Sequence, residues 1–155
     1  MKFRILASCL LAVTFSQHAI ASECTSDDEQ RKYVTNFVES FRSYANNIKA
    51  VEAKVRKNLS KKADDYAKNG LITKEQARNL FVNTLKDPTF NNFDKDKGVI
   101  HSEFMIKVAL FEVEKSKPKE ACIIAKEAFS LFEDIHNINL KQYKLLDERL
   151  ENKKI

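Results

Sequence analysis

Carboxylate side chains gather in one short stretch of the chain, and they are its best candidates for chemistry. Asp94 and Asp96 stand two residues apart, Gly98 follows, and Glu103 comes a little later. Carboxylate oxygens are among the ligands that Ca²⁺ prefers in proteins. The pattern makes Asp94, Asp96 and Glu103 a candidate site for weak calcium binding, and we expect no other metal or cofactor.

The stretch from Phe93 to Phe104 resembles the calcium loop of the EF-hand family. It has acids at the first and third loop positions, a glycine, an aliphatic residue and a later glutamate. The resemblance implies calcium ligation by the three acids named above. Counted from Asp94, Gly98 is fifth rather than sixth and Glu103 tenth rather than twelfth. The alternative interpretation is a polar turn, with Gly98 at a positive φ angle, that leads into a capped helix.

Residues 87–101 as a whole are expected to form a long connection between helices. Asp87-Pro88 would end one helix and Ser102 would cap the next. Because long loops often carry function, we predict a partner-binding surface here. Its residues would be Phe90, Asn92, Phe93, Asp94 and His101. For the two phenylalanines the alternative, which we favour, is a lid folded onto the core.

No catalytic residue is predicted, and we do not expect an enzyme. His101 and His136 have no carboxylate or second histidine at metal-ligand spacing beside them. The 155 residues contain no nucleophile elbow, glycine-rich phosphate loop or paired catalytic cysteines. We interpret His136 as a residue at the edge of the core.

A basic run is the second candidate surface. It comprises Lys54, Arg56, Lys57, Lys61 and Lys62. Helical spacing places most of these side chains away from the apolar stripe of the same segment. They could meet an acidic partner, lipid headgroups or cell-wall polymers, or simply form a solvated outer face.

Helices must position all of these residues, because the chain has only two Gly and two Pro. Residues 27–69 lack both, and their apolar positions recur at steps of three and four, which predicts one long helix. Gly70 is expected to end it, and Thr73 with Gln76 forms a capping box for a second helix. Pro118 suits the start of a fourth helix, with a break near His136. The expected fold is an all-α bundle of four to five helices with a long N-terminal helix.

Residues 1–21 have the layout of a cleaved secretory signal peptide. Lys2 and Arg4 precede the apolar run 5–15, and a small-residue cleavage site follows at 19–21. The mature chain, 22–155, is expected to be one domain, periplasmic or secreted. It would keep 25 basic and 22 acidic residues, a net charge of +3. This charge is too low for a dedicated nucleic-acid binder, and we expect no transmembrane segment.

Cys24 and Cys122 remain after processing, and an oxidising compartment favours a disulfide between them over two free thiols. This bridge would place the starts of the first and fourth helices at the same end of the bundle. A plain up-down-up-down bundle would separate them. The bridge therefore predicts either that the connection 87–101 crosses the bundle or that the first helix folds back at Ser60.

These observations favour an exported helical protein that works by binding a protein partner. By analogy of class, it would act as an immunity protein or inhibitor that neutralises a toxin or hydrolase. Residues 72–76, Ile-Thr-Lys-Glu-Gln, are similar to the Leu-Thr-x-x-Gln motif of the Spy and CpxP family. This resemblance implies the alternative of a periplasmic chaperone or stress protein. A calcium-responsive module is a third hypothesis, and the long apolar stripe could also be buried in a homodimer.

Overall fold

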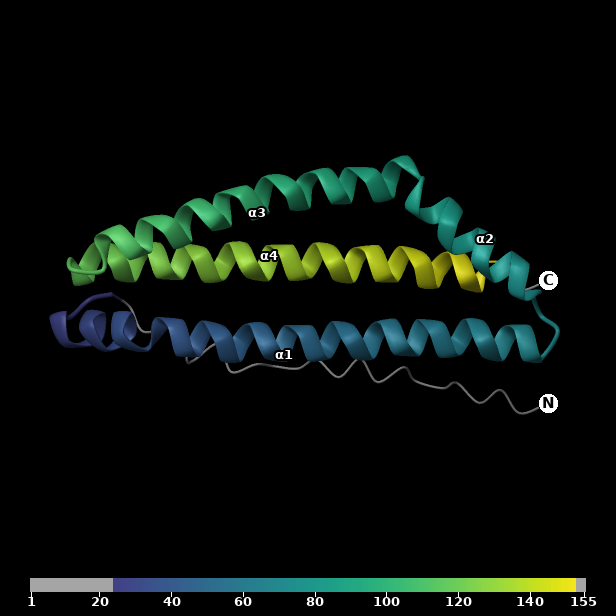
Figure 1. The fold of residues 1–155 in the computed structure, drawn as a ribbon, viewed down its shortest axis with the longest axis horizontal. Helices are drawn as coiled ribbons and strands as arrows, with labels where there is room; N and C mark the ends of the chain where they lie inside the picture. The colour runs from purple at the N-terminus through teal and green to yellow at the C-terminus, as the bar shows by residue number, and fades with distance from the viewer. Residues whose placement is uncertain (1–23, 153–155) are drawn as a thin grey trace.

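A computed structural model describes residues 24–152, and within this range every regular element is a helix. The four helices are α1 (Asp27–Lys68), α2 (Lys74–Leu85), α3 (Pro88–Glu114) and α4 (Pro118–Glu151). They form the elongated bundle of Figure 1. The predicted all-α bundle with a long N-terminal helix is confirmed. The predicted signal peptide lies outside the described residues.

The first helix, α1, is a single element of 42 residues. Ser26 caps its start by accepting a hydrogen bond from the backbone N–H of Glu29, and three acids occupy its first turn. Gly70 ends it with a φ angle of 71°, and the N–H of Leu71 donates to the carbonyl of Tyr66. A glycine is suited to this left-handed position because it has no Cβ. The alternative in which the first helix folds back at Ser60 is therefore wrong.

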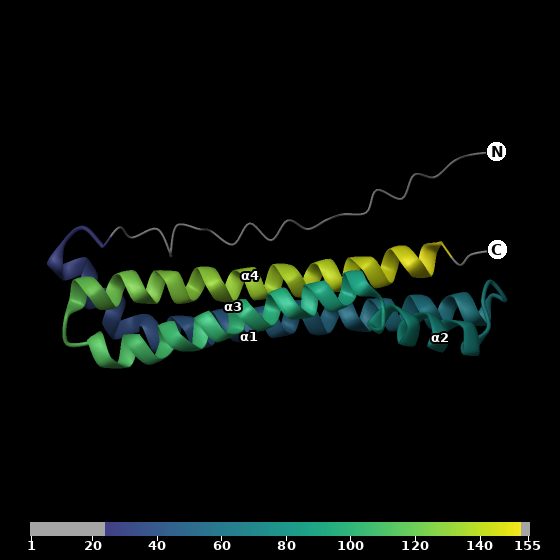
Figure 2. The same cartoon turned by 90° about the horizontal axis from the view of Figure 1, so that it is seen from above.

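The disulfide between Cys24 and Cys122 is confirmed, with a Cα–Cα distance of 6.0 Å. It joins the starts of α1 and α4, which run side by side in the same direction (Figures 1 and 2). The chain returns between them through α2 and α3, which follow one another as a bent helical arm. The topology thus differs from the simple bundle in a way that neither sequence-based alternative anticipated.

Residues 87–101 were predicted to be a loop, and this prediction is wrong. Only Lys86 and Asp87 separate α2 from α3. The Asp87 carboxylate accepts a hydrogen bond from the N–H of Thr89, 2.8 Å away, and so caps α3. Pro88 occupies the first turn, where a proline has no N–H to leave unpaired. The Asp-Pro pair that stops one helix therefore also starts the next.

The interior of α3 contains the residues that were expected to shape the loop. Gly98 lies within the helix and does not adopt a positive φ angle. Ser102 does not cap a helix start; its hydroxyl donates to the carbonyl of Gly98, one turn earlier. The fourth helix is likewise continuous through His136, where a break was expected.

Aromatic side chains fill the core at the disulfide end. Phe37 of α1 and Phe111 of α3 have ring centroids 4.3 Å apart, and Phe41 stacks on Phe104 at 5.5 Å. Phe129 of α4 contacts both α1 rings. The rings of α1 and α3 thus meet across the bundle and bury the aromatic part of the α1 stripe at this end.

A second, smaller core holds α2 against α1 and α4 at the other end. Its buried members are Ala63, Ile72, Leu80 and Leu150. Thr84 is also buried, and its hydroxyl donates to the carbonyl of Leu80. Leu85, the last residue of α2, is 52% exposed. With only 12 residues, α2 covers a limited length of its neighbours.

Candidate functional site

The predicted partner-binding residues do not form one surface, because α3 distributes them around its circumference. Phe90 and Phe93 are half-buried, whereas Asn92, Asp94 and His101 are exposed. The two phenylalanines precede the buried Phe104 at helical spacing, so they belong to the inward side of α3. The expectation that they form part of a loop, as a lid or as free anchors, is therefore wrong.

The three predicted calcium ligands also lie on a helix rather than in a loop. Asp94 accepts hydrogen bonds from Lys97, at 2.7 Å, and from the buried Gln142 of α4, at 3.1 Å. The hydrogen bonds from Lys97 and then Gln142 lower the pKa of the Asp94 carboxyl. Asp96 and Glu103 share a different side of α3, because each residue advances the helix by about 100°. Within residues 24–152, no group of three or more His, Cys, Asp or Glu side chains could hold a metal ion. The loop geometry on which the calcium hypothesis rested is absent from α3.

A buried polar cluster joins the middles of α1 and α4. Oε1 of Glu52 lies 3.0 Å from Nδ1 of His136 and accepts a hydrogen bond of 2.9 Å from Asn139. The side chains of Glu52 and His136 are only 12% and 15% exposed. Since these residues are 84 positions apart, the sequence alone could not identify the partner of His136. The cluster satisfies buried polar groups and fixes the register of the two helices.

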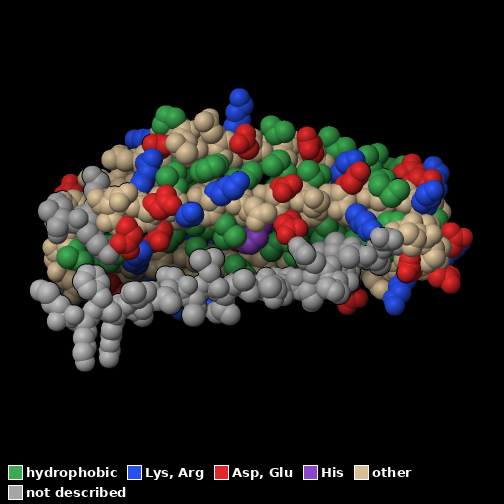
Figure 3. Space-filling model, turned by 180° about the vertical axis from the view of Figure 1, so that it is seen from behind, with side chains coloured by type: hydrophobic (Ala, Val, Ile, Leu, Met, Phe, Trp, Pro, Cys, Tyr) green, Lys and Arg blue, Asp and Glu red, His purple; other side chains and the backbone are tan. Residues whose placement is uncertain are grey.

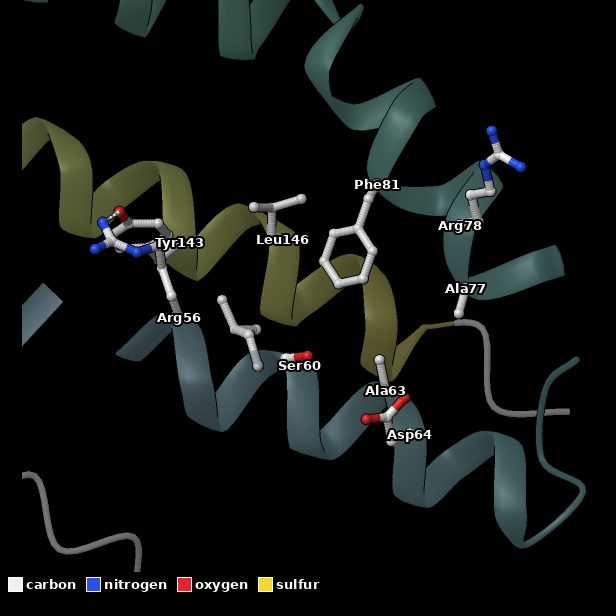
Figure 4. Close-up of a pocket in the computed structure, with 10 residues that line it drawn as sticks. Arg56, Ser60, Ala63, Asp64, Ala77, Arg78, Phe81, Tyr143 and Leu146 are labelled. Carbon is white, nitrogen blue, oxygen red and sulfur yellow. Dashed lines mark hydrogen bonds between the residues drawn. The ribbon is translucent and has the colours of Figure 1, made fainter. Parts of the chain in front are cut away.

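An open apolar cleft of about 350 Å³ lies between α1, α2 and α4 (Figure 4). Phe81 projects from α2 toward Leu146 of α4 and the side chains of α1 below it. The apolar part of the lining comprises Leu59, Ala63, Ala77, Phe81, Tyr143 and Leu146, and the polar part Arg56, Ser60, Asp64 and Arg78. The cleft exists because α2 leaves α1 at Gly70 and covers only one end of the groove between α1 and α4.

The rim of the cleft is positively charged. Nη1 of Arg56 donates to the Tyr143 hydroxyl at 2.8 Å, but Oε2 of Glu52 is 3.8 Å from it. Glu52 and Arg56 thus form a long ion pair within α1, while His136 and Asn139 contact the other oxygen, Oε1, of the same carboxylate. The Arg56 side chain is 56% exposed. Arg78 stands on α2 at the opposite edge, where Figure 4 shows it pointing outward.

Two lysines extend this rim along α1. Lys57 and Lys61 follow Arg56 and Ser60 by one residue each and are exposed. Neither they nor Arg78 forms an ion pair with another described residue of the 24–152 range. Lys62, by contrast, bridges to Asp147 and Glu151 of α4. The basic run therefore divides into a structural member, Lys62, and exposed members beside the cleft.

Sequence reasoning identified Arg56, Lys57 and Lys61 as a basic surface but missed the apolar residues of the cleft. Phe81 and Leu146 have the spacing of core residues, and nothing in their types marks them as accessible. The only available signal was the length of α2, which at 12 residues is too short to cover the 42 residues of α1.

Comparison of the chain with models of protein families, with curated proteins and with solved structures found no match. None of the four described helices is both long enough and apolar enough to cross a membrane.

Proposed function

We propose that this chain is an exported helical binding protein and that the cleft between α1, α2 and α4 receives a protein partner. The partner would insert an apolar side chain between Phe81 and Leu146 and place acidic residues against the basic rim. This proposal keeps the predicted protein partner but moves its contact surface from residues 87–101 to the cleft.

The observation that carries the proposal is that the apolar side chains of the cleft remain accessible, with exposed basic side chains around them. A cleft of about 350 Å³ is at the small end of the range for ligand sites, and is large enough for one bulky side chain. Protein interfaces concentrate their binding energy in such anchors, buried in pockets and surrounded by polar contacts. A single anchor in this cleft with charges around it matches that pattern.

The charge of the rim defines the chemistry of the partner. Of the charged residues that line the cleft, Arg56 and Arg78 are basic and Asp64 is acidic, and the exposed Lys57 and Lys61 lie next to this lining on α1. Such a surface attracts an acidic partner and accelerates its association, with an effect that weakens as salt rises. Arg56 is suited to a carboxylate because its guanidinium offers several donors in one plane, of which one is used by Tyr143.

The predicted cellular role follows from the compartment. The disulfide supports an oxidising environment such as the periplasm or the medium. There, a small helical protein with an apolar cleft is suited to the role of an immunity protein or inhibitor. Its partner would be a toxin or hydrolase with an acidic, apolar contact site.

Affinity capture from periplasmic and secreted extracts tests this proposal. Oxidised mature protein should retain one saturable partner at a fixed stoichiometry. Arg78→Glu should weaken that complex at least tenfold, which is about 1.4 kcal/mol of binding free energy. Lys119→Glu is the matched control, because it makes the same charge change at the disulfide end and should have no effect.

A second pair of variants tests the apolar anchor. Phe81→Asp should abolish capture, whereas Val82→Asp, on the exposed side of α2, should retain it. Circular dichroism must show that both variants remain helical. Capture that survives both Arg78→Glu and Phe81→Asp would contradict the cleft as the contact surface. Capture of many partly unfolded proteins would instead support the chaperone hypothesis.

A further inference from the structure

The positive charge of this protein is concentrated on the middle of α1. Residues 40–63 contain seven basic residues and one acid, a net charge of +6. The other 105 described residues contain 16 basic and 20 acidic ones, a net charge of −4. Figure 3 shows the molecule from behind, where Lys and Arg side chains are interspersed with Asp and Glu over α3 and α4. The middle of α1 therefore carries a charge that the rest of the described chain does not share.

Most of this charge is exposed and unpaired. The one acid, Glu52, is only 12% exposed, and its carboxylate contacts His136 and Asn139 of α4. Lys62 is paired with acids of α4. Five other basic residues of the stretch are exposed and form no ion pair with another described residue: Arg42, Lys49, Lys54, Lys57 and Lys61. With the exposed Arg56, they make up what we call the basic face.

Helical geometry directs the basic face away from the bundle. Each residue advances the helix by about 100°, so Lys54, Lys57 and Lys61 lie within about 60° of one another, opposite the buried Leu59. Arg42 lies within about 60° of Lys57 on the same side. The 24 residues of the stretch are about 36 Å long, and α1 forms one long edge of the bundle (Figure 1). The basic face is therefore a linear array of charges on an outer edge.

We propose that the basic face of α1 binds the surface of a membrane that contains anionic phospholipid. A cluster of four to eight Lys and Arg on one helix is typical of segments that bind acidic lipid headgroups. The basic face has six such residues. The net negative charge of the remaining described chain is repelled by the same surface, so the protein lies with α1 against the bilayer.

The composition of the stretch favours a membrane surface over a single-stranded nucleic acid. Proteins that bind single strands combine a basic groove with aromatic side chains on which bases stack. Here the charges project from a convex edge, and the two aromatic residues of the stretch, Phe41 and Tyr44, pack against the core. The long flexible stems of the lysines allow their ammonium groups to reach one plane. No large apolar side chain is exposed between residues 40 and 63, so the contact is electrostatic and does not insert into the bilayer.

Co-sedimentation with phospholipid vesicles tests the proposal. Oxidised mature protein should bind phosphatidylcholine vesicles that contain roughly 30% phosphatidylglycerol, and should not bind pure phosphatidylcholine. An increase in NaCl from roughly 50 to 500 mM should release it, because salt screens exposed charges. A protein that stays in solution with the anionic vesicles at low salt would overturn the proposal.

Charge reversal within the basic face gives a sharper test. Arg42→Glu combined with Lys54→Glu should weaken binding to the anionic vesicles at least tenfold. The matched control combines Lys95→Glu with Lys119→Glu, two exposed and unpaired positions on α3 and α4, which changes the net charge equally. This control should retain most of the binding. Circular dichroism must show that both double variants remain helical, and equal weakening by the two would overturn the assignment to α1.

Two further measurements separate this proposal from its alternatives. Binding to soluble dextran sulfate without binding to the anionic vesicles would overturn the membrane proposal and assign the basic face to a linear polyanion. Neither Arg42 nor Lys54 lines the cleft. Their double variant should therefore still capture the protein partner proposed above, so the two proposals can fail independently.

Discussion

Removal of the disulfide should have a large effect on the stability of this protein. The bridge joins residues 98 positions apart and closes α1, α2 and α3 into one loop. In the chain-entropy account, a bridge across about 100 residues contributes about 4.7 kcal/mol by restricting the unfolded chain. Unfolding of the 129 described residues has an entropy of roughly 0.27 kcal/mol/K, so this loss corresponds to a decrease in Tm of roughly 17 °C.

The variant should carry Cys24→Ala and Cys122→Ala together. Alanine is preferable to serine because Cys122 is 1% exposed, and a buried hydroxyl would add its own penalty. Urea unfolding, followed by circular dichroism, gives the free energy of unfolding. Wild-type protein unfolded in the presence of a reductant should match the variant. A loss below about 2 kcal/mol in both samples would refute the chain-entropy reasoning for this fold.

Three further predictions concern single positions. Gly70→Ala should destabilise the protein by about 1–2 kcal/mol, because a residue with a Cβ is strained at a φ angle of 71°. Gly98→Ala lies inside α3 with nothing within 4 Å of the added Cβ, so it should stabilise the protein by about 1 kcal/mol. A change of the same sign in the free energy of unfolding of both variants, measured in urea, would contradict the assigned backbone. Leu150→Ala should cost about 2–5 kcal/mol, since this side chain is fully buried where α4 meets α2, and a loss below 1 kcal/mol would refute that packing. Hydrogen bonds from Arg149 and Thr89 lower the pKa of Asp87 from 3.8 to about 2. The stabilising contribution of this carboxylate is therefore complete above pH 4 and is lost as the pH falls toward 2. Asp87→Asn should flatten the decrease in unfolding free energy over this pH interval, and an unchanged profile would show that the Asp87 carboxylate is not responsible.

Helical periodicity was sufficient to predict much of the fold. The apolar steps and the absence of Gly and Pro specified α1, and the capping box at Thr73 specified the start of α2. The two cysteines predicted the bridge because they are the pair that is left when the predicted signal peptide, with Cys9, is set aside. The helices depend on residues that are close in sequence, and the bridge depends on two cysteines that have no other cysteine to pair with. For this reason the sequence was sufficient to predict these features.

The errors arose where one local pattern allowed two structures. Asp87-Pro88 is compatible with a helix stop and with a helix start, and the structure uses it for both. Gly98 was interpreted as a turn residue, although a glycine in an exposed helix costs only about 1 kcal/mol and α3 can tolerate it. The acids that resembled an EF-hand loop were therefore on a helix surface.

The site itself could not be predicted, because it depends on how far one helix covers another. Phe81 and Leu146 have the same spacing as fully buried residues, and only the three-dimensional position of α2 leaves them accessible. The contact between His136 and Glu52 could not be predicted for a similar reason, because the two residues are 84 positions apart in the sequence. Contacts of this range are set by packing rather than by local sequence.

Hydrogen–deuterium exchange of the captured complex tests the central claim most directly. Backbone amides should gain protection in residues 56–64 of α1, 77–81 of α2 and 143–146 of α4 when the partner is bound. Residues 99–113 of α3, which do not line the cleft, should show no change in protection when the partner binds. Protection confined to α3, or to residues 87–101, would contradict the account and place the partner elsewhere.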